Sequence, residues 1–136
     1  MISELVMPIA RAPLRGVRIL LVEDEALIAW DTAESIRSCG ANVIGPAASV
    51  AQACATLDSE APDAAVLNVN LRGESISPLL DKLRLRGVPF IFATGYSQDT
   101  LPEEYAGCTF ISKPFETRTF LQALATAFAK ADKCLS

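Results

Sequence analysis

The sequence of 136 residues contains no histidine. Without an imidazole the chain cannot form a Ser-His-Asp triad or a Cys-His pair, and it cannot carry a phosphohistidine. Cysteine is sparse as well: four are present, at 39, 54, 108 and 134, with no Cys-x-x-Cys spacing. This pattern argues against a zinc site and is typical of reduced thiols that pack in a protein interior. Any chemistry therefore has to use carboxylates, hydroxyls and lysine.

Long apolar runs are missing too. No segment approaches the roughly 18 residues that a membrane-spanning helix requires. Residues 1–15 lack the basic start of a secretory signal, and Pro8 interrupts their short apolar stretch. The sequence therefore predicts a cytoplasmic protein that does not contact a membrane. The formal net charge of −4 disfavours nucleic-acid binding, which depends on clustered Lys and Arg, so we expect other proteins as partners.

What the chain does contain is a regular alternation of short apolar runs and longer helical patterns, which indicates βαβ units around a parallel sheet. Strands are predicted at 17–22, 42–44, 64–69, 88–93 and 108–112. Helices are predicted at 25–39, 49–59, 77–86, 98–105 and 116–130, with Ser49 as a cap and Gly45-Pro46 closing the second strand. The last helix carries an apolar stripe predicted to dock on the sheet, made of Phe120, Leu121, Leu124, Ala127 and Phe128.

The length of the chain and its apolar fraction of 51% predict one domain with one core. We assign this domain to residues 17–131. Residues 1–16 are expected to form a flexible extension or linker remnant, and 132–136 a short tail. Six residues follow Lys130, whereas a DNA-binding output module needs on the order of fifty, so no output domain is expected in this sequence.

Polar residues stand at the carboxyl ends of four predicted strands. Glu23 and Asp24 follow the first strand, and Asn68 lies near the end of the third. Thr94 follows the fourth strand and Lys113 the fifth. In an open parallel sheet, ligands bind beyond the carboxyl ends of the strands, where the strand order reverses. We therefore expect these five side chains to converge on one edge of the sheet.

Four short motifs carry a family resemblance. They read LVEDE at 21–25, NVNL at 68–71, ATGY at 93–96 and SKPF at 112–115. Together, in this order and spacing, they resemble the receiver domains of response regulators over about Val17 to Ala131. The resemblance implies an α/β, flavodoxin-like, doubly wound parallel sheet with strand order 2-1-3-4-5 and five flanking helices. It also implies a role in two-component phosphorelay signalling rather than an enzyme with its own substrates.

The resemblance implies a metal site. Glu23 and Asp24 match the acidic pair that binds Mg²⁺ in receivers, and such oxygen ligands suit a hard cation. Asn70 matches the position whose backbone carbonyl is a further ligand, and Asn68 occupies the place of a third acidic ligand. The alternative is a pair of solvated loop carboxylates followed by an ordinary turn residue.

The resemblance also implies a phosphoryl-binding and switch apparatus. Thr94 matches the hydroxyl that turns toward the phosphoryl group, and Lys113 the lysine that contacts the acceptor carboxylate as a point charge. Receivers commonly hold the bond between this lysine and Pro114 in the cis form. Phe110 matches the aromatic switch position. The alternatives are a strand-end threonine, a solvated lysine and a core phenylalanine.

The chain departs from the family at Asn68, where receivers place the aspartate that accepts the phosphoryl group. Asp63 cannot replace it, because five extended residues of about 3.3 Å each put it roughly 16 Å away. An amide is neutral and lacks the nucleophilic oxygen of a carboxylate, so we expect no phosphorylation and weak Mg²⁺ binding. Asn68 fits two histories: an engineered block in a working receiver, or a native feature of a degenerate one.

The resemblance implies a histidine kinase or phosphotransfer protein as the upstream partner. Downstream it implies a protein target or a homodimer through the face built from the fourth helix, the fifth strand and the fifth helix. A degenerate receiver that binds partners independently of phosphorylation is the alternative function. A small Mg²⁺-dependent phosphohydrolase is disfavoured, because the third strand offers no nucleophile and the short loops offer no substrate lid.

Overall fold

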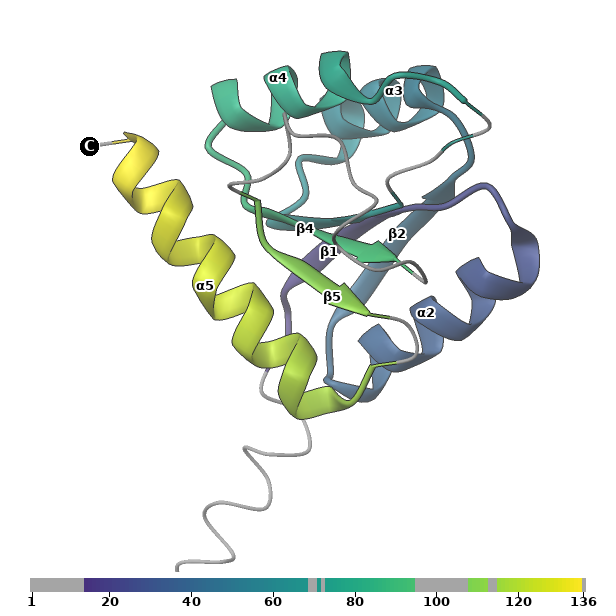
Figure 1. The fold of residues 1–136 in the computed structure, drawn as a ribbon, viewed down its shortest axis with the longest axis vertical. Helices are drawn as coiled ribbons and strands as arrows, with labels where there is room; N and C mark the ends of the chain where they lie inside the picture. The colour runs from purple at the N-terminus through teal and green to yellow at the C-terminus, as the bar shows by residue number, and fades with distance from the viewer. Residues whose placement is uncertain (1–13, 69–70, 72, 95–107, 113–114, 136) are drawn as a thin grey trace, which may run out of the picture.

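A computed structural model describes residues 14–68, 71, 73–94, 108–112 and 115–135. Within these residues strands and helices alternate along the chain as far as β4, which is followed by β5 and α5 (Figure 1). Their bounds are β1 (Arg18–Val22), α2 (Ala26–Ser38), β2 (Asn42–Ala47), α3 (Val50–Glu60), β3 (Ala64–Leu67), α4 (Ser77–Leu85), β4 (Phe90–Thr94), β5 (Phe110–Ser112) and α5 (Thr117–Leu135). None of the helices in this described part is both long and apolar enough to cross a membrane.

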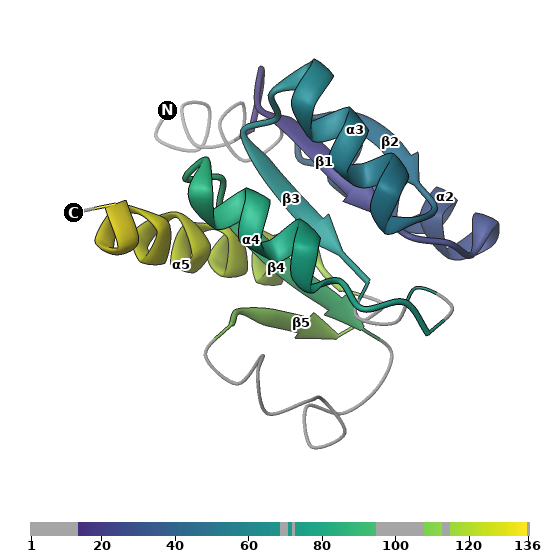
Figure 2. The same cartoon turned by 90° about the horizontal axis from the view of Figure 1, so that it is seen from above.

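The strands form one sheet in the order β2-β1-β3-β4-β5, with every neighbouring pair parallel. This order confirms the predicted topology. Helices α3 and α4 cover one face of the sheet, and α2 and α5 cover the other (Figures 1 and 2). The strand order reverses between β1 and β3, so the carboxyl ends of these two strands mark the edge where a ligand is expected.

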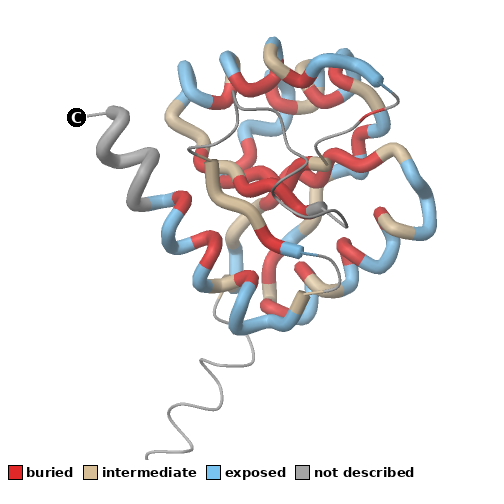
Figure 3. The backbone as a smooth tube through the Cα atoms, in the orientation of Figure 1, coloured by how far each residue is buried: buried red, intermediate tan, exposed pale blue. Residues whose placement is uncertain are grey.

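The near-continuous apolar character of β1 follows from this layering. Ile19 and Leu21 point into the core shared with α2 and α5, whereas Leu20 and Val22 point into the core shared with α3 and α4. Successive side chains of a strand alternate between faces, so a strand covered on both sides needs apolar residues throughout. The central strands are accordingly buried along their length (Figure 3).

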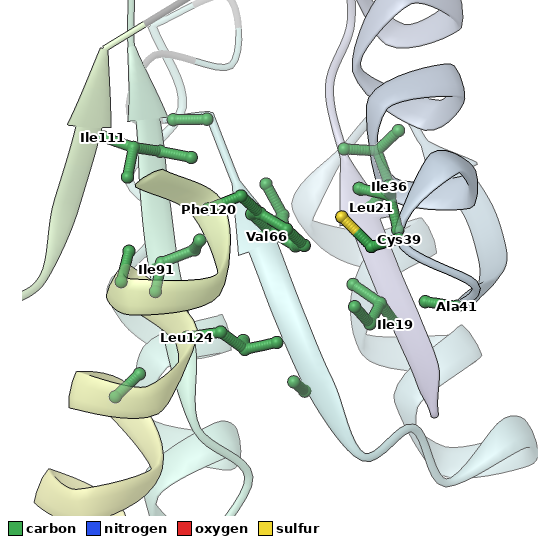
Figure 4. Packing of buried hydrophobic residues seen from close by; sticks show 14 of the residues in the cluster. Ile19, Leu21, Ile36, Cys39, Ala41, Val66, Ile91, Ile111, Phe120 and Leu124 are labelled. Carbon is green, nitrogen blue, oxygen red and sulfur yellow. The ribbon is translucent and has the colours of Figure 1, made fainter. Parts of the chain in front are cut away.

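Helix α5 docks through part of the predicted apolar stripe. Phe120, Leu124 and Ala127 are buried, and Phe120 and Leu124 reach the sheet near Val66 and Ile91 (Figure 4). The outer member of the stripe, Phe128, stays 37% exposed. The docking prediction is therefore confirmed for the centre of the stripe, whereas Phe128 was wrongly included.

Several predicted boundaries differ from the structure. Strand β2 continues through Gly45 and Pro46 to Ala47, β3 ends at Leu67, and α5 extends to Leu135. The predicted helix at 98–105 lies outside the described residues. At the amino end, the backbone N–H of Leu14 donates to the carbonyl of Cys39 at 2.9 Å, so the last residues of the predicted extension already contact the sheet domain. The division at 17 and 131 otherwise stays a prediction.

Candidate functional site

Two acidic residues and one amide come from neighbouring strands of the central sheet. Glu23 and Asp24 follow β1, and Asn68 directly follows β3. The backbone N–H of Asn68 donates to the carbonyl of Val22 at 2.9 Å, which continues the β1–β3 ladder beyond both strands. This pairing places residue 68 beside the start of the acidic segment.

A second backbone contact fixes Glu23 from the other side. Its N–H donates to the carbonyl of Ala47 at 2.9 Å. Strand β2 reaches this position through an irregularity: Leu20 pairs with Ile44, but Val22 pairs with Ala47, so β2 contains an extra residue here. The backbone of Glu23 is thus held by the end of β2.

The side chain of Asn68 connects the two acids. Its Nδ2 lies 2.9 Å from Oε2 of Glu23 and 3.4 Å from Oδ1 of Asp24, and it donates to both. The carboxylates dictate this orientation, because the opposite rotamer would place the amide oxygen against negatively charged oxygens. Glu23 is only 3% exposed, and its Oε2 also accepts from the backbone N–H of Glu25 at 3.2 Å.

Helix α2 begins directly behind this cluster. Glu25 is its N-cap residue and has an extended backbone, while its side chain makes no capping hydrogen bond. The positive end of the helix macrodipole therefore faces the segment that carries Glu23 and Asp24, which favours negative charge there. The edge combines two carboxylates, one amide and a helix amino terminus.

The profile of the response regulator receiver domain matches residues 19–125. The chain belongs to this family. Among solved structures, SdrG from Sphingomonas melonis Fr1 is similar to this receiver, with 37% identity and a TM-score of 0.73 over 82% of this chain and 95% of SdrG. A structure of the BeF3-activated conformation of SdrG matches with 35% identity and a TM-score of 0.71, over 85% of this chain and 98% of SdrG.

Two curated relatives are regulators. The phyllosphere-induced regulator PhyR of Methylorubrum extorquens is 34% identical over 105 residues, which are 74% of this receiver and 39% of PhyR. The transcriptional regulatory protein PdtaR of Mycobacterium tuberculosis is 28% identical over 117 residues, 83% of this receiver and 57% of PdtaR. The receiver thus spans less than two thirds of the length of these curated relatives.

The structure brings Glu23, Asp24 and Asn68 together, as expected of the strand ends. Thr94 ends β4 and pairs in register with Ser112, the last residue of β5. Its backbone therefore lies at the carboxyl edge of the sheet, the edge where Glu23, Asp24 and Asn68 also lie. Lys113 and Asn70 lie outside the described residues, and so does Pro114 with its predicted cis bond. The roles that the receiver family assigns to all these residues stay predictions.

Phe110 begins β5 and is half-buried. Its ring stacks on that of Phe92, with centroids 5.1 Å apart and an interplanar angle of 21°. Asp63 lies at the far end of the sheet, where its Oδ2 accepts from the backbone N–H of Arg18 at 2.9 Å. Asp63 therefore cannot substitute for a carboxylate at position 68.

Sequence reasoning missed a contact that ties the segment after Asn68 to α3. Oε1 of Glu74 accepts from the backbone N–H of Val50 at 3.2 Å, which satisfies one of the free donors in the first turn of that helix. The two residues are 24 positions apart, so no local motif signals the pair. The first turn of α3 is otherwise held by Ser49, whose side chain accepts from the N–H of Gln52 at 3.1 Å, as predicted.

Receiver domains generally bind Mg²⁺ at their acidic pocket, and two carboxylates suit that cation. Mg²⁺ requires its oxygen ligands at about 2.1 Å. In this receiver, however, the hydrogens of the Asn68 amide point at the same two carboxylate side chains that the metal would use. A bridging cation and these amide hydrogens would compete for the same space between the carboxylates of Glu23 and Asp24. In this arrangement the three side chains do not fit a bound Mg²⁺ ion.

Proposed function

We propose that this chain is a receiver in two-component signalling whose pocket is held in the unphosphorylated state because position 68 carries an amide. The observation that carries the proposal is the contact of the Asn68 amide with both Glu23 and Asp24. The side chain that follows β3 at the centre of the acidic cluster offers donors to its neighbours and no carboxylate oxygen to a phosphodonor.

The position of Asn68 supports the proposal that it occupies the phosphoacceptor position of a receiver. It lies next to the last residue of β3 and is aligned with the acidic segment after β1 by the N–H···O contact to Val22. SdrG, which is similar to this chain over nearly the whole length of SdrG, has a BeF3-activated conformation. We propose that this chain keeps the receiver scaffold of such relatives but not the acceptor group. It works in the cytoplasm as a regulator rather than as an enzyme.

The partners follow from the family. Upstream we propose a histidine kinase or phosphotransfer protein, as for receivers in general. Downstream we propose a protein target or a second copy that binds the face expected from the predicted helix at 98–105, β5 and α5; residues 98–105 lie outside the described part of the chain. Neither membrane nor nucleic acid is part of this proposal.

Intact-mass analysis after incubation with a small phosphodonor and Mg²⁺ tests the block. The wild-type chain is expected to take up no phosphoryl group, whereas Asn68→Asp is expected to take up one. Asn42→Asp is the matched control, because it makes the same change at an exposed residue that begins β2, at the opposite end of the sheet. A phosphoryl adduct on the wild-type protein would refute the proposal.

A second candidate function is partner binding that is independent of phosphorylation. It is favoured by two large apolar side chains, Leu27 and Trp30, which are 85% and 64% exposed one turn apart on α2. Such adjacent apolar exposure is typical of protein contact sites. If Asn68→Asp takes up phosphate and its partner binding or oligomeric state changes, the pocket is functional. If it takes up phosphate and neither property changes, the second candidate is favoured.

A further inference from the structure

We infer that the side-chain amide of Asn68 takes the place of a divalent cation between Glu23 and Asp24, so that the pocket keeps its arrangement without metal. The inference rests on the geometry of three side chains. It does not depend on whether position 68 receives phosphate, and it is tested by metal binding and stability instead.

Two carboxylates lie close together at this site. Glu23 is almost fully buried, and a second carboxylate, that of Asp24, lies close enough for one nitrogen to bond both. A buried carboxylate is costly unless hydrogen bonds or an opposite charge stabilise it, and a like charge nearby adds to the cost. In a receiver with three carboxylates, a cation supplies that stabilisation.

The donors of the Asn68 amide match the acceptors of the two acids. A primary amide has two N–H donors on one nitrogen, and here two carboxylates accept from that nitrogen, at 2.9 and 3.4 Å. Hydrogen bonds to ionised acceptors are stronger than those between neutral groups. One amide therefore stabilises the two acids that a bridging cation would otherwise hold. An aspartate at position 68 has no such donors when ionised and would add a third negative charge.

The backbone holds this site in place. The backbones of Glu23 and Asn68 are fixed by hydrogen bonds to Ala47 and Val22, and the strands that lead to them are buried. The amide and the carboxylates therefore meet without a change in the backbone. For a cation to bind between the acids, the side chain of Asn68 would have to turn and give up both hydrogen bonds. The amide thus competes with the metal in addition to lacking a charge.

Thermal unfolding with EDTA and with millimolar Mg²⁺ tests the inference on the whole chain. The melting temperature of the wild type is expected to be the same in both buffers. Asn68→Asp is expected to melt about 4 °C or more lower than the wild type in EDTA and to recover with Mg²⁺. Asn42→Asp adds the same charge at the other end of β2 and is expected to behave like the wild type in both buffers.

Calorimetric titration with Mg²⁺ and Mn²⁺ gives a second measurement. Asn68→Asp is expected to bind at least about tenfold more tightly than the wild type, a factor that corresponds to roughly 1.4 kcal/mol. Asn68→Ala separates the loss of the amide donors from the gain of a negative charge, because it removes the donors without adding charge. It is expected to be less stable than the wild type in EDTA and, unlike the wild type, to gain stability from Mg²⁺.

The side-chain amide protons of Asn68 give a direct readout that does not require a variant to fold. In a ¹⁵N-edited NMR spectrum their signals are expected at the same positions in EDTA and in Mg²⁺. The inference is overturned if Mg²⁺ shifts these signals, if it stabilises the wild type as much as Asn68→Asp, or if Asn68→Asp without metal is as stable as the wild type. Phosphoryl uptake enters none of these measurements, so failure here leaves the proposed function untouched.

Discussion

Glu23 is held by the carbonyl of Ala47, a residue that lies beyond the predicted end of β2. The contact exists because β2 contains an extra residue opposite Leu21, where Gly45 adopts a φ of +101°. A Cβ at position 45 would lie 2.8 Å from the nitrogen of Ala47 and 2.9 Å from the oxygen of Leu21. Both of these neighbours are backbone atoms, so neither can move aside cheaply. The irregularity that positions the acid therefore requires glycine.

Gly45→Ala is expected to destabilise the fold by about 2 kcal/mol or more, because it combines a strained φ with a backbone clash. Gly73→Ala is the matched control: Gly73 also has a positive φ, +82°, but nothing lies within 4 Å of a Cβ built there. This control is expected to lose about 1 kcal/mol. Urea unfolding at equilibrium measures both losses. Equal losses would contradict the role of the close approach to Leu21.

The sequence predicts those parts of this receiver that depend on local pattern. The strand order, the two buried faces of β1 and the Ser49 cap follow from periodicity, from capping chemistry and from the family motifs. The convergence of Glu23, Asp24 and Asn68 follows from their places at strand ends. Apart from the strand order, which the resemblance to receivers implies, these features depend on residues that are neighbours in sequence or on rules that hold for all parallel sheets.

Other features depend on contacts between distant segments, and these were missed or placed wrongly. Gly45-Pro46 is a common turn signal, yet β2 continues through it because its backbone pairs with β1 up to Glu23. The hydrogen bonds from Asn68 to the two acids depend on the side-chain orientation at a junction of two strands. The role of Glu74 at the start of α3 depends on the course of the segment after β3.

Ser49→Ala is expected to destabilise the protein by about 1 kcal/mol, because the side chain of Ser49 accepts from the N–H of Gln52 in the first turn of α3. Ser59→Ala, near the exposed carboxyl end of the same helix, is the control and is expected to change stability by less than about 0.5 kcal/mol. Denaturant unfolding monitored by circular dichroism measures both values. A loss for Ser49→Ala no larger than that of the control would show that the cap is dispensable.

Asp58 joins α3 to α4 through Lys82, whose Nζ lies 2.8 Å from the carboxylate, and through Arg86. The hydrogen bond from Lys82 is the main cause that lowers the pKa of Asp58, with charge attraction to Lys82 and Arg86 adding to it. Because the folded state favours the ionised form, this contribution to stability is present above the unfolded carboxyl pKa of about 3.9. It is lost as the pH falls through the lower pKa of the folded state.

Asp58→Asn is therefore expected to lower stability at neutral pH and to flatten its dependence on pH below about 4. The carboxylate is exposed to solvent, so the effect is expected to be small and to shrink with added salt. Urea unfolding of wild type and variant across acidic pH, at low and high ionic strength, measures it. Parallel pH profiles for the two proteins would mean that the ion pairs contribute nothing to stability.

Cys39 is buried in the core between α2 and the sheet (Figure 4), and burial raises the pKa of its thiol. Cys54 and Cys108 are also free thiols but are partly exposed. Since the thiolate is the reactive form, alkylation of the native protein is expected to modify Cys54 and Cys108 well before Cys39, as peptide mapping by mass spectrometry would reveal.

The folded state favours the protonated thiol of Cys39, so its contribution to stability is complete below the unfolded pKa of about 8.5 and is lost as the pH rises through the higher folded value. Cys39→Ala is expected to be less stable at neutral pH and to lose less stability between neutral and alkaline pH than the wild type. In the alkylation experiment, modification of Cys39 at the same rate as Cys54 and Cys108 would show that the core opens far more readily than its packing indicates.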